Sequence, residues 1–227
     1  MLIEQYGEEI ANKIIDGYSK QRYVTLRANT IKATNEEIKK ELKNSNIEYK
    51  EIEWYKDALI IKNVKENEIR KMPIYEEGKI YLQSLSSMLP PIILEPKEGT
   101  DILDMAAAPG GKTTQIAALT NNKAHITACE KNKIRAERLK YNLQKQGVTC
   151  TNVMTEDARQ LSDYFSFDKI LLDAPCSGSG TLDYNDANVE KYFTEQLIER
   201  SSKTQKTLLS KAIKLLKPGH EMVYSTC

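Results

Sequence analysis

The sequence predicts an α/β fold: a Rossmann-like doubly wound parallel sheet preceded by a small N-terminal α+β module. From Thr100 onward, short apolar strands alternate with longer amphipathic segments, the pattern of a parallel sheet covered by helices. Before this point the expected helices and strands follow no such alternation. We therefore divide the chain into a module over residues 1–82 and a second domain over residues 83–227.

The N-terminal module is expected to begin with an amphipathic helix, because apolar residues recur at helical spacing from Ile3 to Ile14. The segment "YVTLRANT" predicts a strand, and "TNEEIKKEL" opens a helix with a capping box between Thr34 and Glu37. Short strands are expected in "IEYKEIEW" and "ALIIK". A further helix, "SLSSMLPPIIL", is expected to be interrupted by its two adjacent prolines.

The second domain carries the alternating elements. They run in the order "DILDM", a helix from Gly111, "HITACE", a helix from Asn132, "TCTNVM", "DKILLDA", helices through Leu216, and "EMVYSTC". Sheets of this kind bind ligands at the carboxyl ends of their strands. The strand ends are therefore where a functional site is expected.

Composition excludes several classes of protein. The chain is 40% hydrophobic and 29% charged, lacks an apolar run long enough to span a membrane, and begins with a stretch too acidic for a signal peptide. Its four cysteines show no metal-type pairing, so we expect neither a zinc site nor a disulfide framework. Free thiols and the absence of a membrane segment favour a cytoplasmic location.

Charge gives little evidence about partners. Residues 1–100 carry 16 basic and 17 acidic side chains, a net charge of −1, and residues 101–227 carry 17 and 15, a net charge of +2. Two segments are locally basic: residues 131–145, with six basic residues and one acidic, and residues 200–217, with six basic and none acidic. We interpret both as solvated helix faces.

The first strand end is followed by "DMAAAPGGKTT", a run of small residues before a helix. Small residues let a ligand approach the backbone, and the helix N-terminus offers unpaired N–H groups. The segment also resembles the end of a phosphate-binding loop. That alternative is weaker, because Ala106 replaces the first glycine and Pro109 lacks an N–H donor. A site for an adenosyl ligand is the stronger prediction.

The next strand ends carry acids. Glu130 lies 19 residues after Gly111, where a carboxylate can accept hydrogen bonds from ribose hydroxyls. Asp157 follows the third strand, and Asp173 ends the fourth. Each acid alone is expected to be a solvated loop residue. Together with the small-residue loop they predict a site for a nucleoside with a charged tail but no phosphate.

Three motifs in this order, "DMAAAPGGKTT", "DAPCSGSG" and "KPGHEMVYSTC", resemble the RNA (cytosine-5) methyltransferases of the sun/nucleolar-protein family. The earlier segments "LRANTIK" and "YLQSLSSM" are similar to those that precede this family's catalytic domain. The resemblance implies a class I S-adenosylmethionine-dependent domain and a module that helps to hold RNA. The implied partner is ribosomal or transfer RNA, and the expected form is a monomer.

The resemblance also implies roles for the strand-end residues. Glu130 would bind the ribose of the cofactor and Asp157 its adenine, while Lys112 and Asp173 would lie at the cofactor and near the target cytosine. The methionine end of the cofactor would be lined by Ala106, Ala107, Ala108, Pro109, Gly110, Gly111 and Lys112.

Two cysteines at strand ends suit methylation of cytosine carbon-5, a poor nucleophile that needs covalent activation. In the family, the cysteine after threonine attacks carbon-6, and the cysteine after proline assists product release. The resemblance therefore assigns Cys227 as nucleophile and Cys176 as release residue, with Asp173 protonating ring nitrogen-3. Cys129 and Cys150 lie in apolar segments and are expected in the core.

The chain stops at Cys227, whereas family members continue further. We expect that the natural C-terminus is missing and that this form binds cofactor but methylates poorly. Two alternatives remain open. The protein could be an RNA-binding relative without catalysis, or a methyltransferase for another base or for protein, which would leave the paired cysteines without a purpose.

Overall fold

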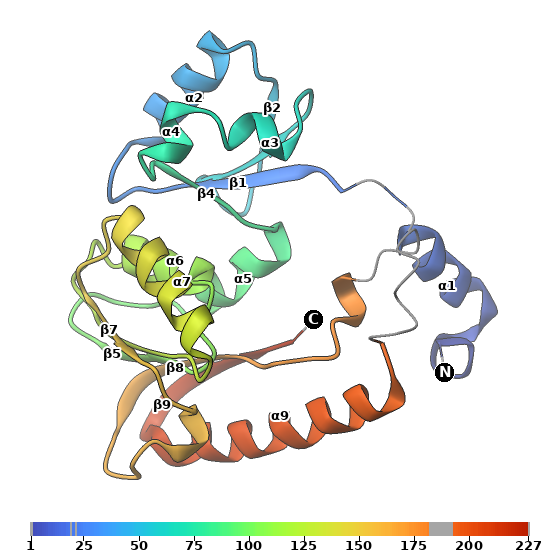
Figure 1. The fold of residues 1–227 in the computed structure, drawn as a ribbon, viewed down its shortest axis with the longest axis vertical. Helices are drawn as coiled ribbons and strands as arrows, with labels where there is room; N and C mark the ends of the chain where they lie inside the picture. Colours follow the sequence, from blue (N-terminus) through green and yellow to red (C-terminus); the bar gives the residue numbers. More distant parts are fainter. Residues whose placement is uncertain (1, 19, 21, 182–192, 227) are drawn as a thin grey trace. The chain divides into compact units, whose positions relative to one another are not determined.

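The computed structural model describes residues 2–18, 20, 22–181 and 193–226 (Figure 1). They fall into two compact units: one combines Met1–Arg22, Pro175–Lys206 and Thr226–Cys227, and the other combines Tyr23–Ala174 and Thr207–Ser225. No helix among the described residues is both long and apolar enough to cross a bilayer.

The first unit contains helix α1 (Leu2–Tyr18), the short 3-10 helix η2 (Ser179–Thr181) and the start of α9 (Glu195–Leu215). The expected N-terminal helix forms, but Gly7 kinks it, with φ at 75°. Ala11 is buried, whereas Ile3, Tyr6 and Ile10 are each at least half exposed.

The part of the module that lies in the second unit, from residue 23 to residue 82, is built on a four-stranded antiparallel sheet in the order β2-β3-β1-β4. The expected strands and the capping box of Thr34 with Glu37 are confirmed. A core of Leu26, Ile38, Leu42 and their neighbours lies between this sheet and its helices. The elements are β1 (Val24–Ala28), α2 (Asn35–Asn44), β2 (Tyr49–Glu51), β3 (Ala58–Ile61), α3 (Glu66–Ile69), α4 (Pro73–Glu76) and β4 (Ile80–Leu82). The domain boundary after residue 82 stays a prediction.

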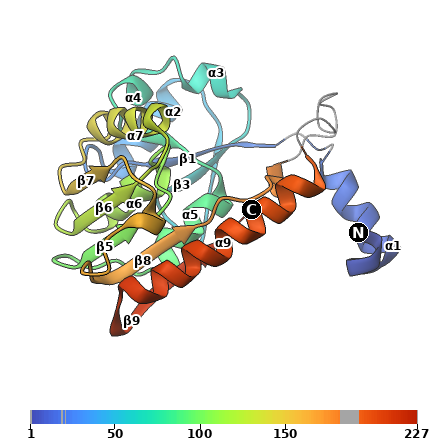
Figure 2. The same cartoon turned by 60° about the horizontal axis from the view of Figure 1, so that its bottom comes forward.

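The predicted parallel sheet is confirmed. Its five strands are hydrogen-bonded in the order β7-β6-β5-β8-β9, and every neighbouring pair is parallel (Figure 2). The chain winds outward from β5 in one direction and then from β8 in the other, so the topological switch point lies between β5 and β8. The strands are β5 (Asp101–Asp104), β6 (His125–Cys129), β7 (Thr151–Met154), β8 (Phe167–Asp173) and β9 (Leu216–Ser225).

Helices cover both faces of the parallel sheet. Helices α5 (Leu85–Ile93), α6 (Gly111–Leu119) and α7 (Lys133–Lys145) lie on the side of the module, and the C-terminal part of α9 lies on the other (Figure 1). Alternate β5 residues serve the two faces. Leu103 packs in the cluster that includes Leu208 and Ala212 of α9, whereas Ile102 packs with Ile116 of α6.

The structure tests the expected interruption of α5 and the expected core positions of Cys129 and Cys150. The predicted interruption of α5 is wrong, because the helix continues through Pro90 and Pro91. Both prolines are buried, and Leu94 N–H still bonds to the Pro90 carbonyl, so packing offsets the missing donors. The predicted core position of Cys129 is confirmed, and burial raises its pKa to about 12. Cys150 is partly buried and packs against a core cluster.

Candidate active site

The loop between β5 and α6 depends on glycine at the helix start. Gly110 caps α6 with φ at 107°, and a Cβ there would lie 2.9 Å from Cδ1 of Leu139. A Cβ on Gly111 would lie 3.1 Å from Cε1 of Tyr81. Side chains at these positions would therefore strain the backbone or displace α7 and β4.

This loop borders a cavity of about 270 Å³ at the carboxyl ends of β5 and β8. Seven of the predicted site residues line it: Ala106, Ala107, Ala108, Pro109, Gly111, Lys112 and Asp173. The cavity also has walls that the sequence did not predict: Tyr81, Leu82, Gln83, Ser84, Ser87 and Asp104. Among the described residues, the predicted Gly110, Glu130, Asp157 and Cys176 lie outside this lining.

Lys112 and Asp173 meet across the switch point. Lys112 Nζ donates to Asp173 Oδ2 at 2.7 Å and to Ser87 Oγ at 2.8 Å. Ser225 Oγ, from the end of β9, donates to Asp173 Oδ1 at 2.7 Å. Each carboxylate oxygen therefore accepts one hydrogen bond and keeps a second lone pair, through which Asp173 can bind a further donor or a proton. The sequence placed Lys112 and Asp173 together, but gave no signal for Ser87 or Ser225.

Asp104 is a buried carboxylate with a raised pKa at the wall of the cavity. Its side chain is fully buried, and burial raises its pKa to about 6. Oδ2 accepts a hydrogen bond from Thr113 Oγ1 at 2.7 Å, whereas Oδ1 has no partner among the described residues. A buried carboxylate oxygen without a donor is costly, which points to a ligand that donates to it. Its place at a strand end, opening the small-residue loop, was the signal that sequence reasoning passed over.

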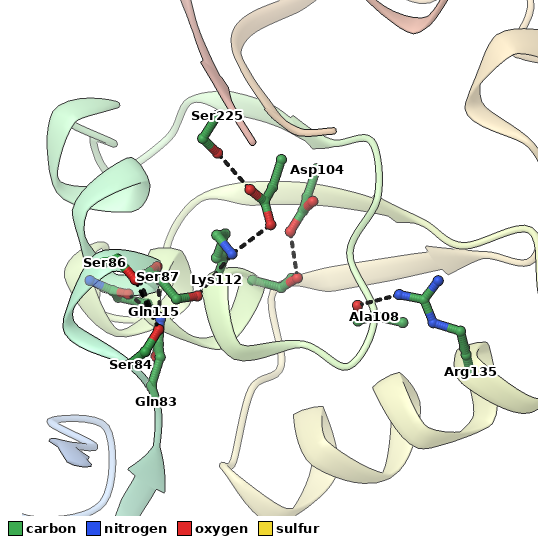
Figure 3. Close-up of polar contacts among 12 residues, drawn as sticks. Gln83, Ser84, Ser86, Ser87, Asp104, Ala108, Lys112, Gln115, Arg135 and Ser225 are labelled. Atoms are coloured by element: carbon green, nitrogen blue, oxygen red, sulfur yellow. Dashed lines mark hydrogen bonds and ion pairs between the residues drawn. The ribbon is translucent and has the colours of Figure 1, made fainter. Parts of the chain in front are cut away.

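Glu130 lies at the end of β6 and is almost fully buried. Its Oε1 accepts from Asn132 N–H at 2.8 Å, and Oε2 lies 3.3 Å from Nη1 of Arg135. Arg135 also donates to the Ala108 carbonyl at 2.8 Å (Figure 3), so it ties this strand end to the loop. The sequence predicts Arg135 on a solvated helix face. Residue spacing gives no sign of its hydrogen bond to the Ala108 carbonyl.

Asp157 lies after β7 and caps the 3-10 helix η1 (Ala158–Gln160). Its carboxylate accepts hydrogen bonds from the guanidinium of Arg159, which lower its pKa. The structure thus keeps Asp157 ionised and locally paired. For the predicted contact with adenine, the Asp157 carboxylate or the Arg159 guanidinium would have to form a new hydrogen bond to the base.

Of the two predicted catalytic cysteines, the structure describes Cys176, and its disulfide differs from the expectation that the cysteines are free thiols. Cys176 belongs to the first unit, is disulfide-bonded in this structure, and its Sγ accepts from Gly178 N–H at 3.2 Å. Cys227 lies outside the described residues. In the sequence, Cys176 comes three positions after Asp173, which ends β8.

A buried polar network joins the module to helix α6. Arg27 of β1 is fully buried, and its Nη2 donates to Thr114 Oγ1 of α6 at 2.9 Å, while its Nε donates to Gln83 Oε1 at 3.2 Å. Gln83 in turn donates to Gln115 Oε1 at 2.9 Å. Desolvation lowers the pKa of Arg27. The sequence offered no sign of these contacts.

Two protein families match the chain. Residues 91–227 match the family described as 16S rRNA methyltransferase RsmB/F, and residues 1–66 match the ferredoxin-like domain of RsmF/B-like methyltransferases. Among curated proteins, "Ribosomal RNA small subunit methyltransferase F" of Shewanella loihica is 36% identical over 89% of this chain and 43% of its own length. The corresponding Shewanella piezotolerans protein is 37% identical over 92% and 45%. The chain thus spans less than half the length of these relatives.

Solved structures give the same fold. A methyltransferase homologue from Pyrococcus horikoshii superposes with a TM-score of 0.87 and 34% identity, covering all of this chain and 71% of that one. NSun6 from the same organism, solved with SFG, gives a TM-score of 0.86 at 26% identity, covering 100% and 81%. The predicted fold class, including a small N-terminal α+β module, is confirmed.

Proposed function

Because the chain belongs to the 16S rRNA methyltransferase RsmB/F family, we propose that it transfers a methyl group from S-adenosylmethionine to carbon-5 of a cytosine in RNA. The observation that carries this proposal is the meeting of the small-residue loop with the Lys112–Asp173 pair at the switch point of the sheet. The names of the relatives favour small-subunit ribosomal RNA as the substrate, over transfer RNA.

The residues present fit this cofactor. Asp104 Oδ1 is buried without a partner among the described residues, so a protonated amino group such as that of the methionine tail would satisfy it. Alanines and glycines in the loop allow a ligand to lie close to the backbone. Glu130 and Asp157 would hold the ribose and the adenine, after exchanging their present partners Asn132 and Arg159. When bound, the cofactor supplies an electrophilic methyl group.

The chain's own residues would activate the base. A thiolate of Cys227 would add to carbon-6 of the cytosine while ring nitrogen-3 gains a proton through Asp173. The bound cofactor would supply the methyl group to carbon-5 and leave as S-adenosylhomocysteine. Loss of the carbon-5 proton and breakage of the bond between carbon-6 and the Cys227 sulfur would then release the methylated base. Lys112 orients Asp173 and places a positive charge at the end of β8, and Cys176 would assist the release.

The runner-up is an RNA-binding relative of the same fold with weak or no catalysis. The two readings differ at Cys176: in an active enzyme, its replacement should leave RNA attached to the protein, and in a binder it should change nothing. For the active enzyme we further propose a cytoplasmic monomer, in which reduction of the Cys176 disulfide would free the thiol for its proposed role in product release.

The test uses this chain, a reductant, and S-adenosylmethionine with a labelled methyl group. Small-subunit ribosomal RNA and bulk transfer RNA serve as separate substrates, and bisulfite sequencing locates the modified base. We expect label at one cytosine of ribosomal RNA, incorporated slowly, because this form of the chain is expected to methylate poorly. Binding of the cofactor without transfer to either RNA would overturn the catalytic proposal in favour of the binding relative.

A further inference from the structure

A second groove lies beside the active site, between the module and α7, with a volume of about 450 Å³. We call it the module–α7 groove. Its volume falls within the range of about 300–1,000 Å³ that is typical of ligand sites. It is lined by Arg70, Tyr75, Ile80, Tyr81 and Leu82 from the module side, by Arg138, Tyr141, Asn142, Lys145 and Gln146 from α7 and its C-cap, and by Pro109. Three cations and three tyrosines line it, and no carboxylate does.

The positive charge of the groove is only partly neutralised. Arg70 is paired with Glu66 on its own short helix. Within the described part of the chain, the ion pairs made by α7 are those of Arg135 with Glu130 and Lys140 with Glu137, and neither involves Arg138 or Lys145. Two cations therefore face the groove without an acidic partner, an arrangement that attracts phosphate.

One face of α7 supplies these groups. Arg138, Tyr141, Asn142 and Lys145 are spaced by three, four and seven residues and so share a side of the helix. Lys140, two positions from Arg138, lies on another side. The predicted solvated face is borne out for Arg138, which is exposed, whereas Lys145 is half-buried, and both line the groove.

The aromatic rings can hold bases. The ring of Tyr141 is on a side chain that is 60% exposed, so its face is open to a stacking partner. The Lys145 ammonium lies 4.0 Å from the centre of the Tyr75 ring, which fixes both side chains at the wall of the groove. Aromatic faces beside cations are how proteins hold single-stranded nucleic acid without base pairing.

Gln146 lines the groove and is held in place by buried hydrogen bonds. Gln146 is 98% buried; its Nε2 donates to the Ile80 carbonyl at 3.1 Å, and its own carbonyl accepts from Asn29 Nδ2 at 2.8 Å. Gln146 Oε1 has no hydrogen-bond partner among the described residues.

The groove is continuous with the active site. Tyr81, Leu82 and Pro109 line both cavities, and Pro109 belongs to the small-residue loop. A strand that places one base at Lys112 and Asp173 can therefore extend into the groove past Tyr81. We propose that the module–α7 groove binds the single-stranded RNA segment next to the target cytosine, with phosphates at Arg138 and Lys145 and a base on Tyr141. The proposal rests on the proposed function and names the path of its substrate.

The test measures the affinity of this chain for a short, fluorescein-labelled single-stranded RNA by fluorescence anisotropy over a series of salt concentrations. Tyr141→Ala should weaken binding at least about fivefold, whereas Tyr141→Phe should bind like the unaltered chain, because stacking needs only the ring. Arg138→Gln should weaken binding and reduce the salt slope by about 1, because one phosphate contact is lost. Lys140→Gln is the matched control, which removes the same charge from another face of α7.

Cofactor affinity, measured by calorimetry, should stay unchanged in all four variants. RNA binding that falls equally in Lys140→Gln and Arg138→Gln, or that is indifferent to Tyr141→Ala, would overturn the groove while leaving the proposed function intact. An unaltered chain that binds cofactor but no RNA would overturn both. A 4-thiouridine-substituted RNA should crosslink to Tyr141, and crosslinks confined to other surfaces would also contradict the proposal.

Discussion

Lys112 Nζ lies 2.7 Å from Asp173 Oδ2, and this contact joins the helix after β5 to the end of β8 across the switch point of the parallel sheet. The pair is partly shielded, with the two side chains 16% and 35% exposed. Its position at the cavity wall makes it the polar centre of the proposed chemistry.

Replacement of Lys112 by Met should lower the rate of methyl transfer by about 100-fold or more, the usual range for loss of a group that assists proton transfer. The Asp173 carboxylate would keep Ser225 but lose the ammonium that orients it. Single-turnover rates with RNA in excess measure the effect. Lys123→Met, which breaks an exposed pair with Glu98, is the control and should be near the unaltered rate. Equal rates in both variants would remove Lys112 from the active centre.

Asp104 should couple stability to pH. Burial raises its pKa to about 6, above the ordinary value of about 3.9, so its contribution to stability is fully present below about pH 4 and is lost as pH rises through about 6. Asp104→Asn should therefore raise the free energy of unfolding at pH 7.5 by on the order of 1–3 kcal/mol, with little change near pH 4. Urea unfolding at the two pH values provides the measurement.

The same variant should bind S-adenosylmethionine at least about tenfold more weakly, because the acceptor proposed for the amino group loses its charge. Calorimetric titration checks this point. A stability change of the same size at both pH values would show that the carboxylate is not destabilised by burial, and unchanged cofactor affinity would remove Asp104 from the binding site.

Gly110→Ala tests the shape of the loop. The residue has φ at 107°, and the added Cβ would lie 2.9 Å from Leu139 Cδ1, so we expect both backbone strain and a clash. Gly99→Ala is the matched control, since Gly99 has φ at 77° and open space around the added Cβ. Strain alone costs about 1–2 kcal/mol, and Gly110→Ala should exceed it and also weaken cofactor binding. Thermal unfolding of both variants decides the matter: equal losses would mean that Leu139 does not constrain the loop.

Local sequence signals predicted much of the fold. Capping by Thr34, strand alternation and the small-residue loop before Gly111 depend on neighbours in the chain, and these elements formed as expected. The prediction differs from the observed structure where tertiary packing determines the conformation. Helix α5 continues through Pro90 and Pro91, and both prolines are buried.

The sequence predicted the site residues that lie at strand ends. It did not predict the residues from β4 and α5 that form other walls of the cavity. Asp173 was predicted because parallel strands end at one edge of the sheet, and the family resemblance implied the place of Lys112 beside it. Contacts such as Arg27 with Thr114 join residues 87 positions apart, and no periodicity reveals them. The orphaned oxygen of Asp104 likewise became visible only when its surroundings were known.

The central claim is a covalent bond between cytosine and a cysteine of this chain, and trapping that bond tests it most directly. Cys176→Ala is incubated with substrate RNA, S-adenosylmethionine and reductant, and the products are separated under denaturing conditions. The account predicts an RNA–protein adduct that the double variant Cys176→Ala/Cys227→Ala does not form. An unaltered chain that methylates RNA while Cys176→Ala yields no adduct, or an adduct that persists in the double variant, would contradict it.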